Sequence, residues 1–537
     1  MPCILILAGG DISRKLPYVK ASCGCPALIP INTRPLASYV IEAYRQASEI
    51  HLFVGSEFVE EVRRELPPRK HHYKLHGLPP TNGVVGSLRK ALESIPDSGD
   101  VVVNLVTTIP TRMPSRDEIL VANQPAHTST EWSVISSGPE SLSFYPKGSE
   151  RPPDALAFTG VFRLDSETLR KTVETSKGEK DLINVLKTAS TLKKLTIGAV
   201  EWIDCGHETN YFRSRAQLVN SRSFNRLKVD GHRGIITKSS ENKLKLAREV
   251  SYFETLPLSL RILFPRLLGQ SGGSTGVESY EMEYYGYPNL AEYLLYWELS
   301  KESWWRCFDS LNDTLNLFRI HPASIGPTRY HEFHWAKTID RIDSYFNDLK
   351  DLSLRDALES QSILLNGRRL APLPELLGKA EKIISSGYRE TVFGVFHGDF
   401  CFNNILFDVN SGIVRLIDPR GSFGDACPGI YGDYRYDLAK LSHSSIGRYD
   451  YFVNGLFDVW VDSSGSFRLE TVLRPNAAWL EEMTRWLISE QAADPLEIEV
   501  MTALLFLSMC PLHRDDTNRQ LAFFLRGMEL LHQAFTS

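Results

Sequence analysis

The chain has 537 residues, of which 42% are hydrophobic and 23% are charged, and its formal net charge is −5. This length is enough for two or three domains with substantial cores, and the slightly acidic balance argues against a nucleic-acid partner held by electrostatic attraction. The sequence contains no run of 18 apolar residues and no signal-peptide pattern, so we expect a cytoplasmic enzyme without a membrane span.

The N-terminal segment predicts a strand and a turn that could bind a nucleotide. Residues 3–8 form an apolar run typical of a buried parallel strand, and Gly9 and Gly10 follow it directly. Glycines let the backbone approach a nucleotide closely, and Arg14 could reach its phosphates. Many α/β proteins open with such a turn for packing reasons alone, so the segments that follow must decide between the two interpretations.

Further landmarks follow along the first 220 residues. They are the segment 30–36, an amphipathic helix at 39–46, a loop at 82–88 that would contact a base, a central strand at 101–105, and strands at 159–162 and 201–206. This order is similar to that of nucleotidyltransferases that activate sugar phosphates with a nucleoside triphosphate. The resemblance implies a doubly wound α/β domain over residues 1–220, with Gly9, Gly10 and Arg14 at the nucleoside triphosphate and Asp204 as a metal ligand.

The sequence departs from this family at two positions. Pro26 stands where the family has a lysine that neutralises the triphosphate, and Thr107 stands where the central strand ends on a metal-binding aspartate. Because two anionic oxygens contribute much of a magnesium site, Asp204 alone would hold the ion poorly. Lys20 could replace the missing lysine, but it does not replace the carboxylate. We therefore expect a binding or scaffolding module, with a working nucleotidyltransferase as the alternative.

A second nucleotide site is indicated downstream. Residues 231–238 predict a glycine turn and a strand that ends on Lys238, and residues 241–256 have helical spacing. Glu249 on this helix could pair with the lysine, and Glu254 is the competing candidate. A solvated surface lysine is the plain alternative for Lys238.

Two short motifs in the C-terminal half supply the groups that phosphoryl transfer needs. A His-Gly-Asp sequence ends at Asp399, and Asn404 follows five positions later. The apolar run 413–417 predicts a short strand, paired with 405–407 as a hairpin, that leads to Asp418. In phosphoryl transfer, one Asp accepts the proton of the attacking hydroxyl, while an Asn and a second Asp bind the metal at the nucleotide phosphates.

These motifs, with Asp437-Leu438-Ala439 further on, resemble the aminoglycoside phosphotransferase and choline kinase family, a branch of the protein-kinase-like fold. The resemblance implies an α+β domain with a small lobe at 221–285 and a large lobe at 286–537. It makes Asp399 the catalytic base, and it makes Asn404 and Asp418 the ligands of Mg²⁺.

The same resemblance implies how ATP binds. Lys238, paired with Glu249, would contact the α- and β-phosphates, and main-chain groups around Glu283 to Tyr285, among them Glu283 and Tyr284, would receive the adenine. It gives Asp437 the task of pinning the catalytic loop. We expect His397 to anchor this loop rather than act as a base, because a neighbouring carboxylate already suits that role.

The sequence indicates the acceptor less clearly than it indicates the nucleotide. Apolar residues at helical spacing predict helices at 290–299, 304–318, 338–349, 479–490 and 495–509, which shape the acceptor pocket in the resembling family. Asp425, Tyr431, Tyr434 and Arg435 could touch an acceptor, although a surface loop explains them equally well. Aromatic side chains suit a quaternary ammonium such as choline, whereas Arg420 and Arg435 favour an anionic or polyhydroxy acceptor such as a sugar or sugar acid.

Three hypotheses follow from the order of the motifs. The leading one is an ATP-dependent small-molecule kinase, fused to a nucleotidyltransferase-like domain and serving bacterial capsule or surface polysaccharide synthesis, a pathway inferred by analogy. The second is a bifunctional enzyme that makes an NDP- or CDP-activated sugar or choline-type headgroup and binds a second nucleoside triphosphate. The third is a non-catalytic binding protein. The sequence specifies neither the acceptor, the preferred nucleotide nor the oligomeric state.

Overall fold

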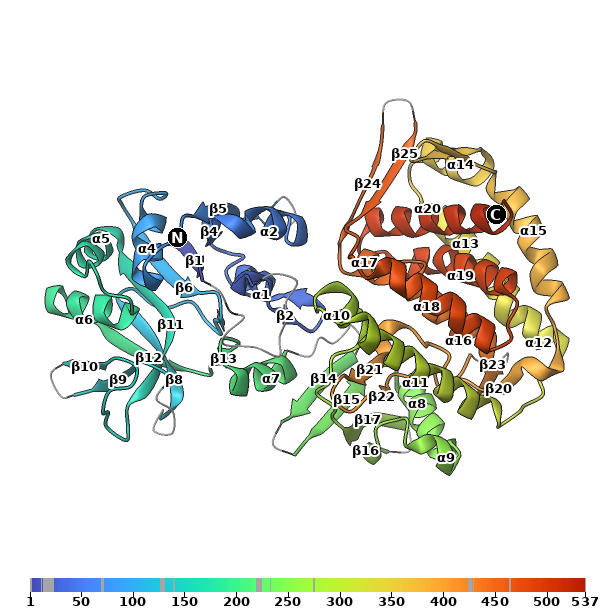
Figure 1. Cartoon of the computed structure of the whole chain (residues 1–537), viewed down its shortest axis with the longest axis horizontal. Coiled ribbons are helices and arrows are strands. Elements are labelled where there is room, and N and C mark those ends of the chain that lie inside the picture. The colour runs from blue at the N-terminus through green and yellow to red at the C-terminus, as the bar shows by residue number, and fades with distance from the viewer. Residues whose placement is uncertain are drawn as a thin grey trace. The chain divides into compact units, whose positions relative to one another are not determined.

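The computed structural model describes residues 2–10, 12, 24–68, 72–125, 131–138, 141–218, 225–231, 233–273, 276–423, 427, 429–462 and 465–536. The chain divides into two compact units (Figure 1). Unit 1 comprises Met1–Leu218 with Tyr296–Glu298, and unit 2 comprises Val219–Leu295 with Leu299–Ser537.

Unit 1 is built on a nine-stranded mixed sheet with the strand order β10-β9-β11-β6-β1-β4-β5. Strand β8 joins this sheet by pairing with β11, and β12 pairs with β8. Strand β1 pairs in parallel with β4 and β6, and β4 pairs in parallel with β5, whereas β11 runs antiparallel to β6. The strands are β1 (Cys3–Ala8), β4 (Glu49–Gly55), β5 (Lys74–Leu78), β6 (Asp100–Leu105), β8 (Glu118–Pro125), β9 (Val134–Ser137), β10 (Leu142–Tyr145), β11 (Leu156–Asp165) and β12 (Thr196–Val200).

Both faces of this sheet are covered, which is why β1 is apolar at every position. Ile4 and Ile6 belong to one core cluster, and Leu5 and Leu7 belong to the other, as the alternation of side chains along a strand requires. The first core includes residues of α1 (Leu36–Ala43), α2 (Val59–Glu65) and α7 (Glu208–Gln217), and the second includes residues of α4 (Gly83–Leu92), α5 (Ser166–Thr175) and α6 (Leu182–Leu192). The predicted α/β domain is confirmed for unit 1, although its sheet is mixed.

One predicted segment of unit 1 has a different structure. Residues 82–88, expected as a loop, form the beginning of α4, and only Asn82 precedes the helix. The apolar positions Val85, Leu88 and Leu92 all lie on the buried side of this helix. Their helical spacing therefore outweighs the loop preference of Asn82 and Gly83. Two short pairs complete the unit: β2 (Pro30–Ile31) with β3 (Arg34–Pro35), and β7 (Thr108–Ile109) with β13 (Ile203–Asp204).

Unit 2 begins with a four-stranded antiparallel sheet in the order β14-β15-β17-β16. Its strands are β14 (Asn225–Asp230), β15 (Ile235–Ser240), β16 (Leu267–Gly273) and β17 (Gly276–Glu283), and it is accompanied by helices α8 (Lys243–Thr255) and α9 (Leu258–Arg261). The side chain of Asn242 accepts a hydrogen bond from the N–H of Lys245 and so caps the start of α8. The expected helix at 241–256 is therefore present.

The rest of unit 2 is mainly helical. Its longer helices are α10 (Leu290–Leu295), α11 (Lys301–Arg319), α13 (Lys337–Asp348), α14 (Leu352–Ser360), α15 (Leu373–Ser386), α16 (Tyr434–Ser445), α18 (Ala477–Glu490), α19 (Pro495–Met509) and α20 (Thr517–Ala534), with the short helices α12 (Pro327–His331) and α17 (Tyr449–Val453). Its strands are β18 (Ile363–Leu365), β19 (Arg368–Leu370), β20 (Phe393–Val395), β21 (Ile405–Asp408), β22 (Ile413–Leu416), β23 (Tyr431–Asp433), β24 (Phe457–Val461) and β25 (Phe467–Thr471). The predicted hairpin is confirmed, because β21 and β22 pair antiparallel.

One helical segment, Pro495–His513, is long and apolar enough to cross a membrane by length and composition. However, 72% of it is buried within the protein. Thr502 on this segment also hydrogen-bonds the carbonyl of Ala439 in α16. Burial of this kind is what a core helix of a globular unit shows, so the segment is weak grounds for a membrane span.

Candidate functional site

The loop that carries Asp399 is held by Asp437, a buried residue of α16. The carboxylate of Asp437 accepts hydrogen bonds from the main-chain N–H groups of His397, at 2.7 Å, and of Gly398, at 2.8 Å. Gly398 has a φ of +77°, and a Cβ atom there would lie 2.8 Å from the Cβ of Arg420. Glycine is therefore required at this turn. Burial raises the pKa of Asp437 to about 7, although the two N–H groups favour the charged form.

His397 links the same loop to the chain just before Asp418. Its Nε2 lies 3.1 Å from the carbonyl oxygen of Ile417, and its Nδ1 lies 3.2 Å from the N–H of Asp399. Both contacts are satisfied by a neutral ring that donates from Nε2 and accepts at Nδ1. Burial lowers the pKa of His397 to about 4, against the opposing pull of Asp399 and Asp418, so the ring is uncharged near neutral pH. Its contacts are those of a loop anchor.

Asp399 has two side-chain neighbours that fix its carboxylate. The Nδ2 group of Asn404 donates to its Oδ2 at 3.0 Å, and the Nζ of Lys440 lies 2.9 Å from its Oδ1. Burial by itself would lower the pKa of Lys440, but the charge of Asp399 and other neighbours raise it above its ordinary value, so Lys440 is a cation. Lys440 was not among the predicted site residues. Its sequence signal is its position three residues after Asp437, on the same face of α16.

Lys238 joins the antiparallel sheet to the same region. Its Nζ lies 2.7 Å from Glu249 on α8 and 2.5 Å from Oδ1 of Asp418. Lys238 is 4% exposed, and burial by itself would lower its pKa, but the two carboxylates raise the pKa above its usual value. Tyr280 donates a hydrogen bond of 2.8 Å to Glu249 and fixes it further. The competing candidate, Glu254, is exposed on the other side of α8.

The oxygen atoms near Asp418 have the chemistry of a magnesium site. Because Nδ2 of Asn404 donates to Asp399, its Oδ1 is the side-chain atom that could bind a cation. The carboxylate of Asp418 is a second hard oxygen donor, and Mg²⁺ in phosphate-binding sites commonly uses one or two carboxylates together with phosphate oxygens. The donor set therefore fits the predicted ion.

The segment expected to contact the adenine, around Glu283 to Tyr285, already uses two of its main-chain N–H groups. The N–H of Glu283 donates to the carbonyl of Arg266 at 3.1 Å, and the N–H of Tyr284 donates to the carbonyl of Gly234 at 2.8 Å. The side chain of Glu283 accepts from the hydroxyl of Tyr285 at 2.9 Å. The N–H groups of Glu283 and Tyr284 are thus bonded to neighbouring segments, which leaves their carbonyl oxygens and the main chain of Tyr285 as the groups that could receive an adenine.

Two predicted acceptor residues have structural roles instead. Arg435 is fully buried, and its guanidinium lies 2.7 Å from Asp433 and 2.7 Å from Glu497. Tyr434 is also buried, beneath Arg319. The sequence could not reveal this, because Glu497 is 62 residues from Arg435. Tyr431 is 39% exposed on β23, and Asp425 lies outside the described residues.

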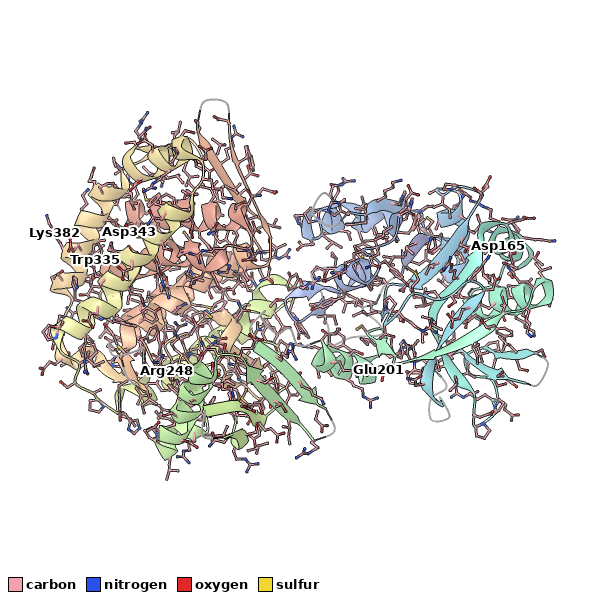
Figure 2. The ribbon with its side chains drawn as sticks, turned by 180° about the vertical axis from the view of Figure 1, so that it is seen from behind. Asp165, Glu201, Arg248, Trp335, Asp343 and Lys382 are labelled. Carbon is pink, nitrogen blue, oxygen red and sulfur yellow. The ribbon has the colours of Figure 1, made fainter. Side chains whose placement is uncertain are left out.

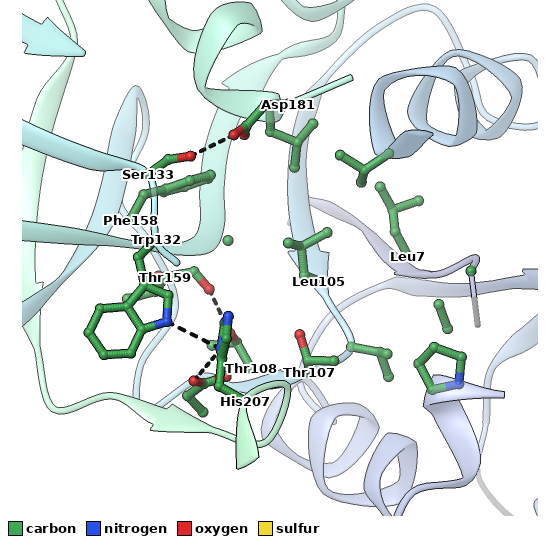
Figure 3. A pocket seen from close by; sticks show the side chains of 18 of the residues that line it. Leu7, Leu105, Thr107, Thr108, Trp132, Ser133, Phe158, Thr159, Asp181 and His207 are labelled. Atoms are coloured by element: carbon green, nitrogen blue, oxygen red, sulfur yellow. Dashed lines mark hydrogen bonds and ion pairs between the residues drawn. The ribbon is translucent and has the colours of Figure 1, made fainter. Parts of the chain in front are cut away.

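Unit 1 contains a separate cavity of about 510 Å³ (Figure 3). Gly9 and Gly10 line it at the end of β1, and Gly10 has a φ of +115°, which favours glycine. The cavity is also lined by Thr107 and Asp204, so the structure brings these predicted residues together. Arg14 and Lys20 lie outside the described residues.

The hydrogen bonds of Asp204 do not suit the expected metal site. Its Oδ1 accepts from the N–H of Gly206 at 2.9 Å, and its Oδ2 lies 2.9 Å from Nδ2 of Asn210 and 2.7 Å from Nδ1 of His207. These bonds hold Asp204 at the start of α7. Thr107 supplies a hydroxyl where a second carboxylate would be needed, so the residues present do not fit a magnesium site built on two carboxylates.

His207 and two tryptophans form an aromatic wall of this cavity that was not predicted. The Nε1 of Trp132 lies 3.2 Å from Nδ1 of His207, as Figure 3 shows. Trp132 also meets Trp202 edge to face, with ring centroids 5.2 Å apart. Because His207 Nδ1 can either donate to Asp204 or accept from Trp132, the shorter contact with the carboxylate favours donation.

Comparison with known proteins finds no matching family model and no matching curated protein. Three solved structures resemble the N-terminal part. A candidate glucose-1-phosphate thymidylyltransferase from Bacillus anthracis in complex with a sucrose is 17% identical, with a TM-score of 0.35, and the match covers 42% of this chain and 98% of that chain. A UDP-glucose pyrophosphorylase complexed with UDP-glucose is 16% identical, with a TM-score of 0.33, and the match covers 40% of this chain and 97% of that chain.

The third is a UDP-glucose pyrophosphorylase from Acinetobacter baumanii, which is 14% identical with a TM-score of 0.32, covering 40% of this chain and 93% of that chain. At these identities a likeness concerns the fold alone. It gives neither an activity nor a substrate to this chain.

Proposed function

We propose that unit 2 is an ATP- and magnesium-dependent phosphotransferase of the aminoglycoside phosphotransferase-like type, acting on a hydroxyl group of a small molecule. The observation that carries the proposal is the position of Lys238, which touches both Glu249 and Asp418. Asp418 is in turn connected, through the contact between His397 and Ile417, to the loop of Asp399. Phosphoryl transfer needs these groups in one place, although they come from segments far apart in the sequence.

The chemistry assigns one task to each residue. The acceptor hydroxyl loses its proton to Asp399 while its oxygen bonds to the γ-phosphorus of ATP, and the bond from that phosphorus to the bridging oxygen breaks to release ADP. Lys238 binds the α- and β-phosphates. Asn404 and Asp418 would hold Mg²⁺, which neutralises charge on the phosphates. Asp437 and His397 keep Asp399 in position.

The experiment incubates the full-length protein with ATP, Mg²⁺ and a pooled panel of sugars, sugar acids and amino alcohols, and it detects new phosphorylated masses. Asp399→Asn should lower the rate at least about 100-fold, because the general base is lost. Asp408→Asn is the matched control, since the carboxylate of Asp408 accepts hydrogen bonds from the turn residues Asn410 and Ser411 of the hairpin. A folded protein that yields no product, or an Asp399→Asn protein that matches the wild type, would refute the proposal.

For unit 1 we propose binding of a nucleotide or sugar phosphate, and nucleotidyl transfer is the second candidate function. The glycine turn and the aromatic wall of the cavity support binding. Thr107 and the hydrogen bonds of Asp204 speak against transfer. Release of pyrophosphate from a nucleoside triphosphate and a sugar phosphate, abolished by Asp204→Asn, would establish the bifunctional enzyme. A role in surface polysaccharide precursor synthesis then depends on the product identified.

A further inference from the structure

Four basic residues belong to elements near the loop of Asp399: Lys440 contacts Asp399 itself, and the N–H of Arg420 donates to the carbonyl of His397 at 3.0 Å. Lys337 and Arg341 are one helical turn apart on α13, Lys440 lies on α16, and Arg420 follows β22. Among these four, only Lys440 has a carboxylate partner among the described residues, and that partner is Asp399. Like charges one turn apart on a helix destabilise it, so a ligand of opposite charge is the simplest compensation.

Three aromatic rings hold this cluster together. The Nζ of Lys337 lies 4.5 Å from the ring centroid of Phe333, 4.9 Å from that of Phe423 and 5.1 Å from that of Tyr436. The guanidinium of Arg420 lies 5.1 Å from the same Phe423 ring. Lys337 and Arg420 therefore share one ring. Lys337 reaches α16 through Tyr436, and the shared Phe423 ring packs on Tyr436 with ring centroids 5.5 Å apart.

Tyr436 connects the cluster to the proposed catalytic base. It lies four residues before Lys440 on α16, so the two side chains are on the same face of that helix. The pKa of Lys337 is held well below its usual range by burial and by the positive charges of Arg341, Arg420 and Lys440. An anion beside Lys337 would oppose this shift and favour the charged form of its side chain.

We propose that Lys337, Arg341 and Arg420 form a subsite for an anionic group of the acceptor, a carboxylate or a phosphate ester, while Lys440 stays on Asp399. The inference rests on the proposed phosphotransfer in unit 2 and names its substrate class. The acceptor is an alcohol that already carries a negative charge: its hydroxyl lies at Asp399, and its charged group lies on the cationic subsite. A quaternary ammonium acceptor such as choline is disfavoured by this charge.

Calorimetry on the full-length protein tests the subsite directly. The protein is first saturated with Mg²⁺ and a non-hydrolysable ATP analogue, which fills the phosphate site at Lys238, and is then titrated with glucuronate, glucose 6-phosphate, glucose or choline at constant ionic strength. We expect an anionic probe to bind at least about tenfold more tightly than its neutral counterpart, which corresponds to a difference of about 1.4 kcal/mol.

Substitutions of the cationic residues test whether the anion binds at the subsite. Lys337→Met and Arg341→Met should each remove most of the anion preference, and Arg341→Lys should retain part of it. Lys382→Met is the matched control, because Lys382 is exposed on α15 and lies at the outer edge of unit 2 in Figure 2. Asp425→Asn tests a carboxylate that follows Arg420 by five positions in the sequence and lies outside the described residues. Equal melting temperatures identify the variants that remain folded.

Anion preference that is lost in the Lys337 and Arg341 variants supports the subsite. No anion preference, or a preference that survives in the Lys337 and Arg341 variants, overturns the subsite. Weaker binding of the ATP analogue in these variants also overturns it, because the cations would then serve the nucleotide. Asp399-dependent phosphorylation of a neutral or cationic acceptor alone refutes the inference and leaves the phosphotransferase standing. Anion binding at these residues without Asp399-dependent phosphorylation of any probe refutes the phosphotransferase and the acceptor role together.

Discussion

Lys440 places its Nζ 2.9 Å from the Oδ1 of Asp399, so the proposed base is an ion pair rather than an isolated carboxylate. Lys440 lies on α16, and Asp437 of the same helix accepts a hydrogen bond from the main chain of the loop that carries Asp399. One helix therefore fixes both the main chain and the carboxylate of the base.

Replacing Lys440 with Met should lower kcat for phosphotransfer by about 10-fold to 100-fold, because a charge-assisted hydrogen bond of about 1.5–3 kcal/mol is lost from Asp399. The KM for ATP should change less than kcat. Steady-state kinetics for both substrates measure this split. Lys440→Arg, which can restore the ion pair, should recover part of the rate, and a Met variant as active as the wild type would contradict the role.

The pair of Lys238 and Glu249 should contribute to stability as well as to nucleotide binding. Glu249→Ala leaves the buried Lys238 with one partner fewer, and breaking such a pair costs about 3–5 kcal/mol of the free energy of unfolding. Glu254→Ala, an exposed glutamate on the same helix, should cost less than about 0.5 kcal/mol. Urea unfolding of both variants measures the difference. Equal losses in the free energy of unfolding would show that the buried pair does not stabilise the protein.

Asp437→Asn should loosen the loop without removing any residue that touches substrate. An amide can accept with only one oxygen, so the N–H of His397 or of Gly398 loses its acceptor, at a cost of about 1–3 kcal/mol. We expect faster amide hydrogen exchange at these two residues, together with a lower kcat. Unchanged exchange protection would mean that the loop is held by other contacts.

The buried His397 predicts how stability depends on pH. Its pKa in the folded protein is about 4, below the ordinary value of 6.5, so the unfolded chain binds more protons between these two values. The contribution of His397 to the free energy of unfolding is therefore fully present above about pH 6.5. It is lost as the pH falls toward 4, by up to about 3 kcal/mol.

Comparing wild type with His397→Gln over pH 4 to 7.5 separates this contribution from those of other groups. The difference in unfolding free energy between the two proteins should shrink as the pH falls. A difference that stays constant over this range would show that His397 is not buried in its neutral form.

The sequence alone determined the features that depend on short stretches of chain. The apolar run of β1 with its glycine turn, the helix α8 that carries Glu249, and the hairpin leading to Asp418 were all predictable, because their signals lie within about ten to fifteen neighbouring residues. The order of Asp399, Asn404 and Asp418 was predictable for the same reason. The helix α4, expected as a loop over residues 82–88, was not predicted because its buried apolar face outweighs the loop preference of Asn82 and Gly83.

Only the tertiary structure decided which side chains meet. Arg435 was expected near an acceptor, but Asp433 and Glu497 enclose it, and Lys440 was overlooked although it touches Asp399. The proposed cationic subsite joins α13 and the segment after β22, and no local pattern encodes that meeting. A buried charge is stable only beside a partner. The packing that supplies this partner depends on elements remote in the sequence.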